Sequence, residues 1–158
     1  MGVEIERKFL VDHDKWRHLK KRAGTHYHQG YLLDEVKCTI RVRLAGKKGF
    51  VTIKGANSGI TRKEYEYQIP GSEASELIGN FAKSAVEKIR YRITFAGKLW
   101  EVDEFLGENE GLIMAEIELK DEKEEFKKPD WVTVEVSHDN RYYNSNLSKN
   151  PFKNWPAK

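Results

Sequence analysis

The sequence lacks several features that would place it in a large class of proteins. It has a single cysteine, Cys38, so no disulfide can form within the chain. No apolar run approaches the roughly 20 residues of a membrane-spanning helix, and the N-terminus has no basic segment followed by an apolar one, as a secretory signal would. Its 28 Lys and Arg residues face 25 Asp and Glu residues, whereas a nucleic-acid binder usually has a basic excess. We therefore expect a cytoplasmic protein that contacts neither membrane nor nucleic acid.

The length of 158 residues suits one domain with its own core. No repeat or linker divides the chain, so residues 1–158 are predicted to form a single domain. Apolar and polar side chains alternate along most of it, which is typical of β-strands. The predicted fold class is mainly β (α+β), with strands at 4–11, 25–33, 38–45, 50–54, 60–69, 86–96, 98–106, 113–120 and 131–136.

Two helices are expected between these strands. Asp12 or Asp14 could cap a helix over residues 15–20, and Ser72 is predicted to be the N-cap of another. Apolar residues after Ser72 recur at helical spacing, so this helix needs an apolar surface to pack against. The Asn-, Ser- and Lys-rich tail is expected to form mostly turns with an aromatic anchor.

The polar faces of the strands carry almost only charged side chains. Glu4, Glu6 and Lys8 share one face of the first strand, because successive side chains point to opposite sides. Like charges recur two residues apart, which is unfavourable unless opposite charge is held nearby. The basic set is Lys8, Arg41, Arg43, Lys54, Arg62, Lys88, Arg90 and Arg92, and the acidic set is Glu4, Glu6, Glu64, Glu66, Glu101, Asp103, Glu116 and Glu118.

Two architectures could hold these charged faces. In a sandwich they would cover the solvated side of a sheet. In a closed barrel they would line a tunnel, and the apolar outer face would accept the helices. The barrel accounts better for the like-charge pairs and for the scarcity of Ser and Thr. Because carboxylates suit Mg²⁺ or Mn²⁺ and paired Arg and Lys suit phosphate oxygens, it predicts a metal–polyphosphate site for phosphoryl transfer.

The order of these residues resembles that of the triphosphate tunnel metalloenzymes, also called the CYTH superfamily. The similar motifs are Glu4-x-Glu6-x-Lys8, Arg41-x-Arg43, Lys54, Glu64-x-Glu66, Lys88-x-Arg90, Asp103 and Glu116-x-Glu118. The tail Asp139-x-Arg141-Tyr142-x-Asn144 resembles the small bacterial single-domain branch that includes inorganic tripolyphosphatases. The resemblance implies a closed eight-stranded antiparallel barrel with a charged interior and helices packed outside, and divalent-metal-dependent hydrolysis of a triphosphate.

The resemblance also implies roles for individual residues. The implied ligands of Mg²⁺ or Mn²⁺ are Glu4, Glu6, Asp103, Glu116 and Glu118, with Glu64 and Glu66 serving a second ion or positioning basic residues. The implied phosphate-binding residues are Lys8, Arg41, Arg43, Lys54, Lys88 and Arg90. Lys8 and Tyr31 resemble a pair that positions or deprotonates the attacking water in some members, and Lys88 competes for that role.

The predicted substrate is inorganic tripolyphosphate, cleaved to pyrophosphate and phosphate, because little chain remains outside the barrel to recognise an organic group. Nucleoside or thiamine triphosphate is the alternative, and the loops at 55–59 and 121–129 would then select it. Class IV adenylyl cyclase activity is a further alternative. A non-catalytic polyphosphate- or nucleotide-binding module would gain nothing from so many carboxylates. The sequence leaves the oligomeric state open, with a homodimer as one option.

Overall fold

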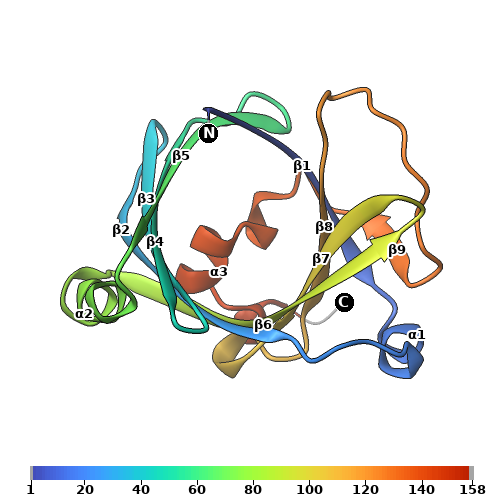
Figure 1. Ribbon diagram of the computed structural model, residues 1–158, viewed down its shortest axis with the longest axis horizontal. Coiled ribbons are helices and arrows are strands. Elements are labelled where there is room, and N and C mark those ends of the chain that lie inside the picture. Colours follow the sequence, from blue (N-terminus) through green and yellow to red (C-terminus); the bar gives the residue numbers. More distant parts are fainter. Residues whose placement is uncertain (1, 157–158) are drawn as a thin grey trace.

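Eight antiparallel strands close into a barrel, shown end-on in Figure 1. The computed structural model describes residues 2–156, so residues 1, 157 and 158 of the predicted domain lie outside it. Around the barrel the order is β1-β5-β4-β3-β2-β6-β7-β8, and β8 pairs again with β1. The strands are β1 (Gly2–Val11), β2 (Thr25–Asp34), β3 (Cys38–Ala45), β4 (Lys48–Gly55), β5 (Thr61–Ile69), β6 (Ser84–Phe95), β7 (Lys98–Phe105) and β8 (Ile113–Glu118).

The first strand is the seam of the barrel. Its N-terminal part pairs with β5, where Glu4 lies opposite Arg62, and its central part pairs with β8, where Lys8 lies opposite Glu116. Its last residues also pair with β9 (Val132–Glu135), a short strand beside the closed barrel. The face of β1 that carries Glu4, Glu6 and Lys8 therefore lies where the two edges of the sheet meet.

The alternation in the sequence separates the two faces of the barrel as predicted. Charged side chains point inward, whereas apolar side chains of the strands pack under helices and loops on the outside. One outer cluster holds Phe9, Trp16, Trp100 and Trp131 next to helix α1 (His13–His18), which Asp12 caps through the backbone N–H of Lys15. The sandwich is thus excluded, because the solvated face it requires is the interior of a closed barrel.

Helix α2 (Gly71–Phe81) covers β2, β3 and β4 from outside, with Ala74 and Ile78 buried against them. The prediction that Ser72 caps this helix is wrong. The N-cap is Pro70, two residues earlier, and its carbonyl oxygen accepts the first backbone hydrogen bonds. Gly71 passes so close to the chain that an added Cβ would lie 2.2 Å from the carbonyl oxygen of Lys47, which explains glycine at this turn.

The tail after β9 is more ordered than expected. It forms the short 3-10 helices η2 (Asn140–Tyr142) and η3 (Phe152–Asn154) around an α-helix, α3 (Asn144–Lys149), so the expectation of mostly turns is wrong there. The aromatic anchor is present, because Trp155 packs against Tyr142 with ring centroids 5.0 Å apart. In Figure 1, α3 lies across the bore of the barrel, whereas α1 and α2 lie outside it.

The remaining connections are short or lie on the outside. The 3-10 helix η1 (Gly107–Asn109) joins β7 to β8. Residues 121–128 form an irregular loop whose Phe126 packs against Trp100 at 5.7 Å between ring centroids. Over residues 2–156, no helix has the length and apolar character to cross a membrane.

Candidate active site

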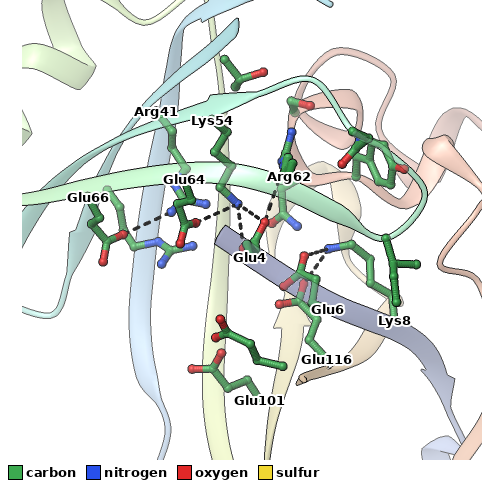
Figure 2. Close-up of a pocket in the computed structure, with 18 of the residues that line it drawn as sticks. Glu4, Glu6, Lys8, Arg41, Lys54, Arg62, Glu64, Glu66, Glu101 and Glu116 are labelled. Carbon is green, nitrogen blue, oxygen red and sulfur yellow. Dashed lines mark hydrogen bonds and ion pairs between the residues drawn. The ribbon is translucent and has the colours of Figure 1, made fainter. Parts of the chain in front are cut away.

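A cavity of about 250 Å³ lies inside the barrel and is lined mainly by charged side chains. The inward faces of the strands supply these side chains, as Figure 2 shows for several of them. Every residue predicted for the site except Asp103 lines this cavity. Those present are Glu4, Glu6, Lys8, Tyr31, Arg41, Arg43, Lys54, Glu64, Glu66, Lys88, Arg90, Glu116 and Glu118.

Lys8 lies between two carboxylates on neighbouring strands. Its Nζ is 3.0 Å from Oε1 of Glu6 and 2.9 Å from Oε2 of Glu116. Burial opposes the charge on Lys8, but Glu116 and Glu6 outweigh it and raise the pKa of the ammonium. Burial also opposes ionisation of Glu116, yet Lys8 and Arg90 lower its pKa well below the usual range. Lys8 is therefore a fixed cation and Glu116 a fixed anion.

Asp103 lies behind the cavity wall and has no exposed surface. Its two oxygens accept from Nε and Nη2 of Arg90 at 2.7 and 2.8 Å, and Oδ2 lies 2.8 Å from Nζ of Lys88. Such a bidentate pair fixes a guanidinium in one plane. Asp103 thus holds two of the predicted phosphate-binding cations in place.

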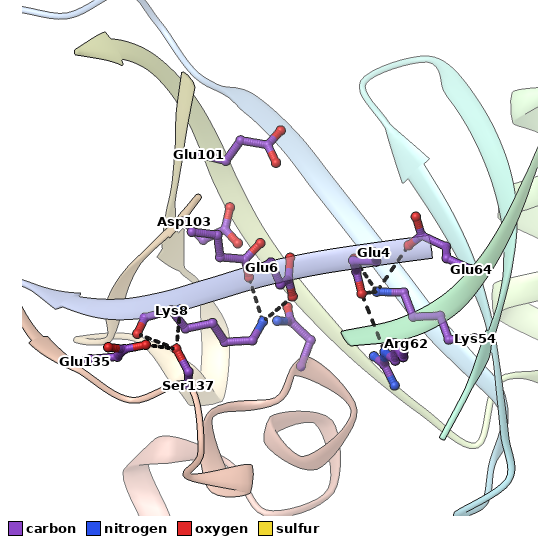
Figure 3. A network of polar contacts seen from close by, with 12 residues as sticks. Glu4, Glu6, Lys8, Lys54, Arg62, Glu64, Glu101, Asp103, Glu135 and Ser137 are labelled. Atoms are coloured by element: carbon purple, nitrogen blue, oxygen red, sulfur yellow. Dashed lines mark hydrogen bonds and ion pairs between the residues drawn. The ribbon is translucent and has the colours of Figure 1, made fainter. Parts of the chain in front are cut away.

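A second group of ion pairs gathers where β1 meets β5, and Figure 3 shows it beside the Lys8 group. Lys54 reaches Glu4 at 3.2 Å and Glu64 at 3.4 Å, and Arg62 reaches Glu4 at 3.5 Å. Lys54 is shared between two acids and Glu4 between two cations, so an anion that replaces one partner of Lys54 leaves it the other.

Arg41 is incompletely satisfied. Its Nη2 donates to Oγ1 of Thr52 at 3.1 Å and lies 3.5 Å from Oε2 of Glu66, but its buried Nε has no hydrogen-bond partner within residues 2–156. A buried donor without an acceptor is costly. Arg41 lines the cavity, so its guanidinium could turn to donate to an oxygen acceptor there and relieve that cost.

Glu118 differs from the other predicted carboxylates. In the part of the chain that the structure describes, it is the one member of that set without an ion pair. Partial burial and the negative charges of Glu4 and Glu64 raise its pKa to about 7. The carboxylates of Glu4, Glu64 and Glu118 thus create a region of negative potential in the cavity. Across residues 2–156, no three Asp, Glu, His or Cys side chains already converge as ligands of one ion.

Burial disfavours the charged form of two other cations of the cavity, Lys88 on β6 and Arg43 on β3. Burial lowers the pKa of Lys88 to about 7, against the attraction of Asp103. Burial and the charges of Arg41 and Arg90 lower the pKa of Arg43 to about 10. Lys88 is paired with Asp103, whereas Arg43 has no ion pair with a carboxylate of residues 2–156.

Sequence reasoning missed several neutral residues of the site, among them Asn144, which lines the cavity, and Gln29, which is buried beside it. Gln29 lies on the same face of β2 as Tyr31 and is fully buried, and Asn144 of α3 accepts from Nζ of Lys88 at 2.9 Å. The alternation already placed Gln29 on the inward face, but an uncharged side chain gave no reason to select it. Asn144 was hidden because its segment lacks the periodicity of a longer helix.

Comparisons with known proteins agree with this architecture. A family model described as the CYTH domain matches residues 2–150. The chain belongs to the CYTH family. A CYTH relative from Acetivibrio thermocellus, named inorganic triphosphatase, is 53% identical over 98% of this chain and 99% of its own.

Two further matches have the same printed name. An inorganic triphosphatase from Nitrosomonas europaea is 35% identical over 92% of this CYTH chain and 97% of its own length. A crystal structure of an inorganic triphosphatase superposes with a TM-score of 0.63 at 31% identity, covering 97% of this chain and 99% of that one. The similarity thus extends over the whole barrel and its tail.

Proposed function

We propose that this CYTH protein is a divalent-metal-dependent triphosphatase that cleaves inorganic tripolyphosphate into pyrophosphate and phosphate. The observation that carries the proposal is a barrel cavity lined by buried cations and carboxylates together, where the cations can take phosphate oxygens and the carboxylates a divalent ion. The names of the relatives at 53% and 35% identity support the same activity. Hydrolysis of a phosphoric anhydride depends mainly on positioning and on neutralising charge, which this cavity is built to do.

The basic side chains that line the cavity would bind the phosphates. Guanidinium groups can donate two parallel hydrogen bonds to a phosphate, and Asp103 already holds Arg90 in a fixed plane. The buried Nε of Arg41 has no acceptor from the described residues, so a phosphate oxygen would complete its hydrogen bonding. The implied phosphate-binding set is Lys8, Arg41, Arg43, Lys54, Lys88 and Arg90.

The carboxylates that line the cavity suit a divalent cation. Mg²⁺ and Mn²⁺ prefer oxygen ligands, and crowding of carboxylates around Glu118 is what such an ion would relieve. Glu4, Glu6, Glu64, Glu66, Glu116 and Glu118 would hold one or two ions, and Asp103 would contribute by orienting its two cations. When bound, the metal supplies positive charge to the phosphoryl oxygens as they develop negative charge.

Lys8, Tyr31 and Lys88 are the proposed positioning groups for the attacking water. Lys8 is held by Glu6 and Glu116 at the seam, so its ammonium can donate but not accept. Tyr31 and Lys88 lie on β2 and β6, which are neighbours in the barrel. Lys8 lies on β1, which does not pair with β2, so Lys8 and Tyr31 face the cavity from strands that are not neighbours.

The shape of the site favours an inorganic substrate over a nucleotide. The cavity of about 250 Å³ lies below the roughly 300–1,000 Å³ of pockets that take drug-sized ligands. Of the two loops that could select an organic group, the one over residues 121–128 packs on the outside of the barrel through Phe126 and does not line the cavity. Only Asn57 and Gly59 of the other loop reach the cavity.

Phosphate release from tripolyphosphate, ATP and thiamine triphosphate, each with Mg²⁺, Mn²⁺ or chelator, tests the proposal. We expect turnover of tripolyphosphate above the other two and its loss with chelator. A preference for ATP or thiamine triphosphate would refute the inorganic substrate, and binding without any turnover would favour a polyphosphate-binding module.

A further inference from the structure

A neutral amide lies buried beside the charged cavity, in contact with residues that line it. Gln29 has no exposed surface, and its side chain makes three hydrogen bonds. Its Oε1 accepts from Nε of Arg43 at 3.0 Å, and its Nε2 donates to the Tyr31 hydroxyl at 2.9 Å and to Oδ1 of Asn144 at 3.3 Å. Both N–H groups of the amide are therefore used, and the side chain joins β3 to α3.

The chemistry of the partners fixes which way this amide points. Nε of Arg43 can only donate, so the amide atom that faces it must be the oxygen. The nitrogen of Gln29 must then face Tyr31 and Asn144. The same reasoning orients Asn144, because its Oδ1 also receives the Nζ donor of Lys88 at 2.9 Å. Arg43 and Lys88 thus fix which group donates and which accepts in this series of hydrogen bonds.

This direction determines what the Tyr31 hydroxyl can do. Its oxygen accepts from Gln29, so its own proton must point elsewhere. The charged side chains with an electrostatic effect on the Tyr31 hydroxyl are Arg41, Arg43 and Lys8. Each of them can donate a hydrogen bond but cannot accept one. Within residues 2–156, no acceptor hydrogen-bonds to this hydroxyl. Because Tyr31 lines the cavity, the proton faces the space that a substrate would enter.

We propose that Gln29 is a positioning residue that holds the Tyr31 hydroxyl as a hydrogen-bond donor toward an oxygen of the bound triphosphate. The inference rests on the proposed function and assigns within it a role to a residue that does not touch the substrate. Burial raises the pKa of Tyr31, so the phenol keeps the proton that it donates. A hydroxyl in this setting stabilises negative charge and is not the base that activates water.

A double-mutant cycle between positions 29 and 31 tests the proposal. Gln29→Glu keeps the oxygen that faces Arg43 but replaces the donor with an acceptor, so the Tyr31 hydroxyl would turn to donate to the new carboxylate. Tyr31→Phe removes the hydroxyl alone. The matched control is Gln68→Glu, the same chemical change at an exposed position outside the cavity. The readouts are kcat, KM and the Kd for tripolyphosphate by calorimetry.

We expect Tyr31→Phe to lower kcat/KM by about tenfold or more in the native protein, since hydrogen bonds to charged groups are the stronger kind. In the Gln29→Glu background the same change should cost less than about twofold, and Gln68→Glu should behave as the native protein. If Gln29→Glu does not fold, Gln29→Met removes the donor without adding charge, and the cost of Tyr31→Phe should again shrink by at least about threefold.

Additive effects of the two substitutions would overturn the proposal, because a purely structural role of Gln29 would leave the cost of Tyr31→Phe unchanged. The proposed function fails separately, through the absence of turnover by the native protein. In that case the cycle is evaluated with the Kd for tripolyphosphate, where the same loss of coupling supports the inference and additivity refutes it.

Discussion

Asp103→Asn should destabilise the protein strongly even when no metal is present. The substitution keeps the shape of the side chain but removes the negative charge that contacts Arg90 at 2.7 and 2.8 Å and Lys88 at 2.8 Å. Arg90 would retain Glu116 and Glu101, each at 3.3 Å, and Lys88 would retain the neutral Asn144 at 2.9 Å. Two buried cations would thus share less negative charge than they need.

Breaking a buried ion pair by removing one partner costs about 3–5 kcal/mol. The amide can still accept a hydrogen bond from Arg90, so we expect the lower part of that range, about 3 kcal/mol. This is a large share of the roughly 5–15 kcal/mol by which a domain is stable. The loss should therefore be plain in an equilibrium unfolding curve.

The assay is urea unfolding followed by circular dichroism in the presence of chelator. Asp130→Asn is the matched control, because Asp130 is exposed and the same change there should alter the free energy of unfolding by less than about 1 kcal/mol. If Asp103→Asn unfolds within about 1 kcal/mol of the native protein, the carboxylate does not stabilise the fold. A role confined to binding metal would then be the better explanation.

Three other predictions follow from separate parts of the molecule. Glu116→Gln should lower metal-dependent phosphate release by about 100-fold or more with an unchanged circular dichroism spectrum, and native activity would remove this carboxylate from the site. Glu135→Gln should destabilise at neutral pH by about 0.5–1 kcal/mol, because a hydrogen bond from Arg7 lowers the pKa of Glu135. That stabilisation is present above the unfolded-state pKa of Glu135 and is lost as pH falls through its folded-state pKa. Unfolding curves of the native protein and the variant should therefore converge in acid. A difference that persists there would contradict a stabilising ion pair between Arg7 and Glu135. Gly30→Val should cost about 1–3 kcal/mol, since an added Cβ would lie 2.7 Å from Cβ of Ala82, just after α2, and 3.2 Å from Ile78. Gly79→Ala meets nothing within 4 Å and should not destabilise; similar melting temperatures of the two variants would refute this account of Gly30.

The charged half of the site was readable from sequence because strand geometry converts spacing into position. Arg41 and Arg43 are two residues apart, so they had to share a face, and the like charge on that face required opposite charge from other strands. The closed barrel supplies that charge. Spacing could not show how deeply each side chain is buried. Asp103 and Glu101 share the inward face of β7, yet Asp103 lies behind the cavity wall because Lys88 and Arg90 cover both its oxygens.

The neutral half of the site could not be found in the same way. An uncharged side chain such as Gln29 becomes meaningful only when its hydrogen-bond partners are known, and these come from β3 and α3. Asn144 required the path of the tail across the barrel. Local rules also failed at Ser72, because close approach of Gly71 to the hairpin between β3 and β4 fixes where α2 begins.

The seam along β1 also has a consequence for folding. The contact between Lys8 and Glu116 spans 108 positions of the chain, and that between Arg7 and Glu135 spans 128. One edge of β1 can pair once β5 is present, but its pairing with β8 and β9 requires most of the domain. Contacts this distant in sequence slow folding, because the entropy of closing a long loop is lost before the contact forms. Until then β1 has an unpaired edge, and the charged side chains that it carries, Glu4, Glu6, Arg7 and Lys8, are a common protection of such edges against pairing with another copy.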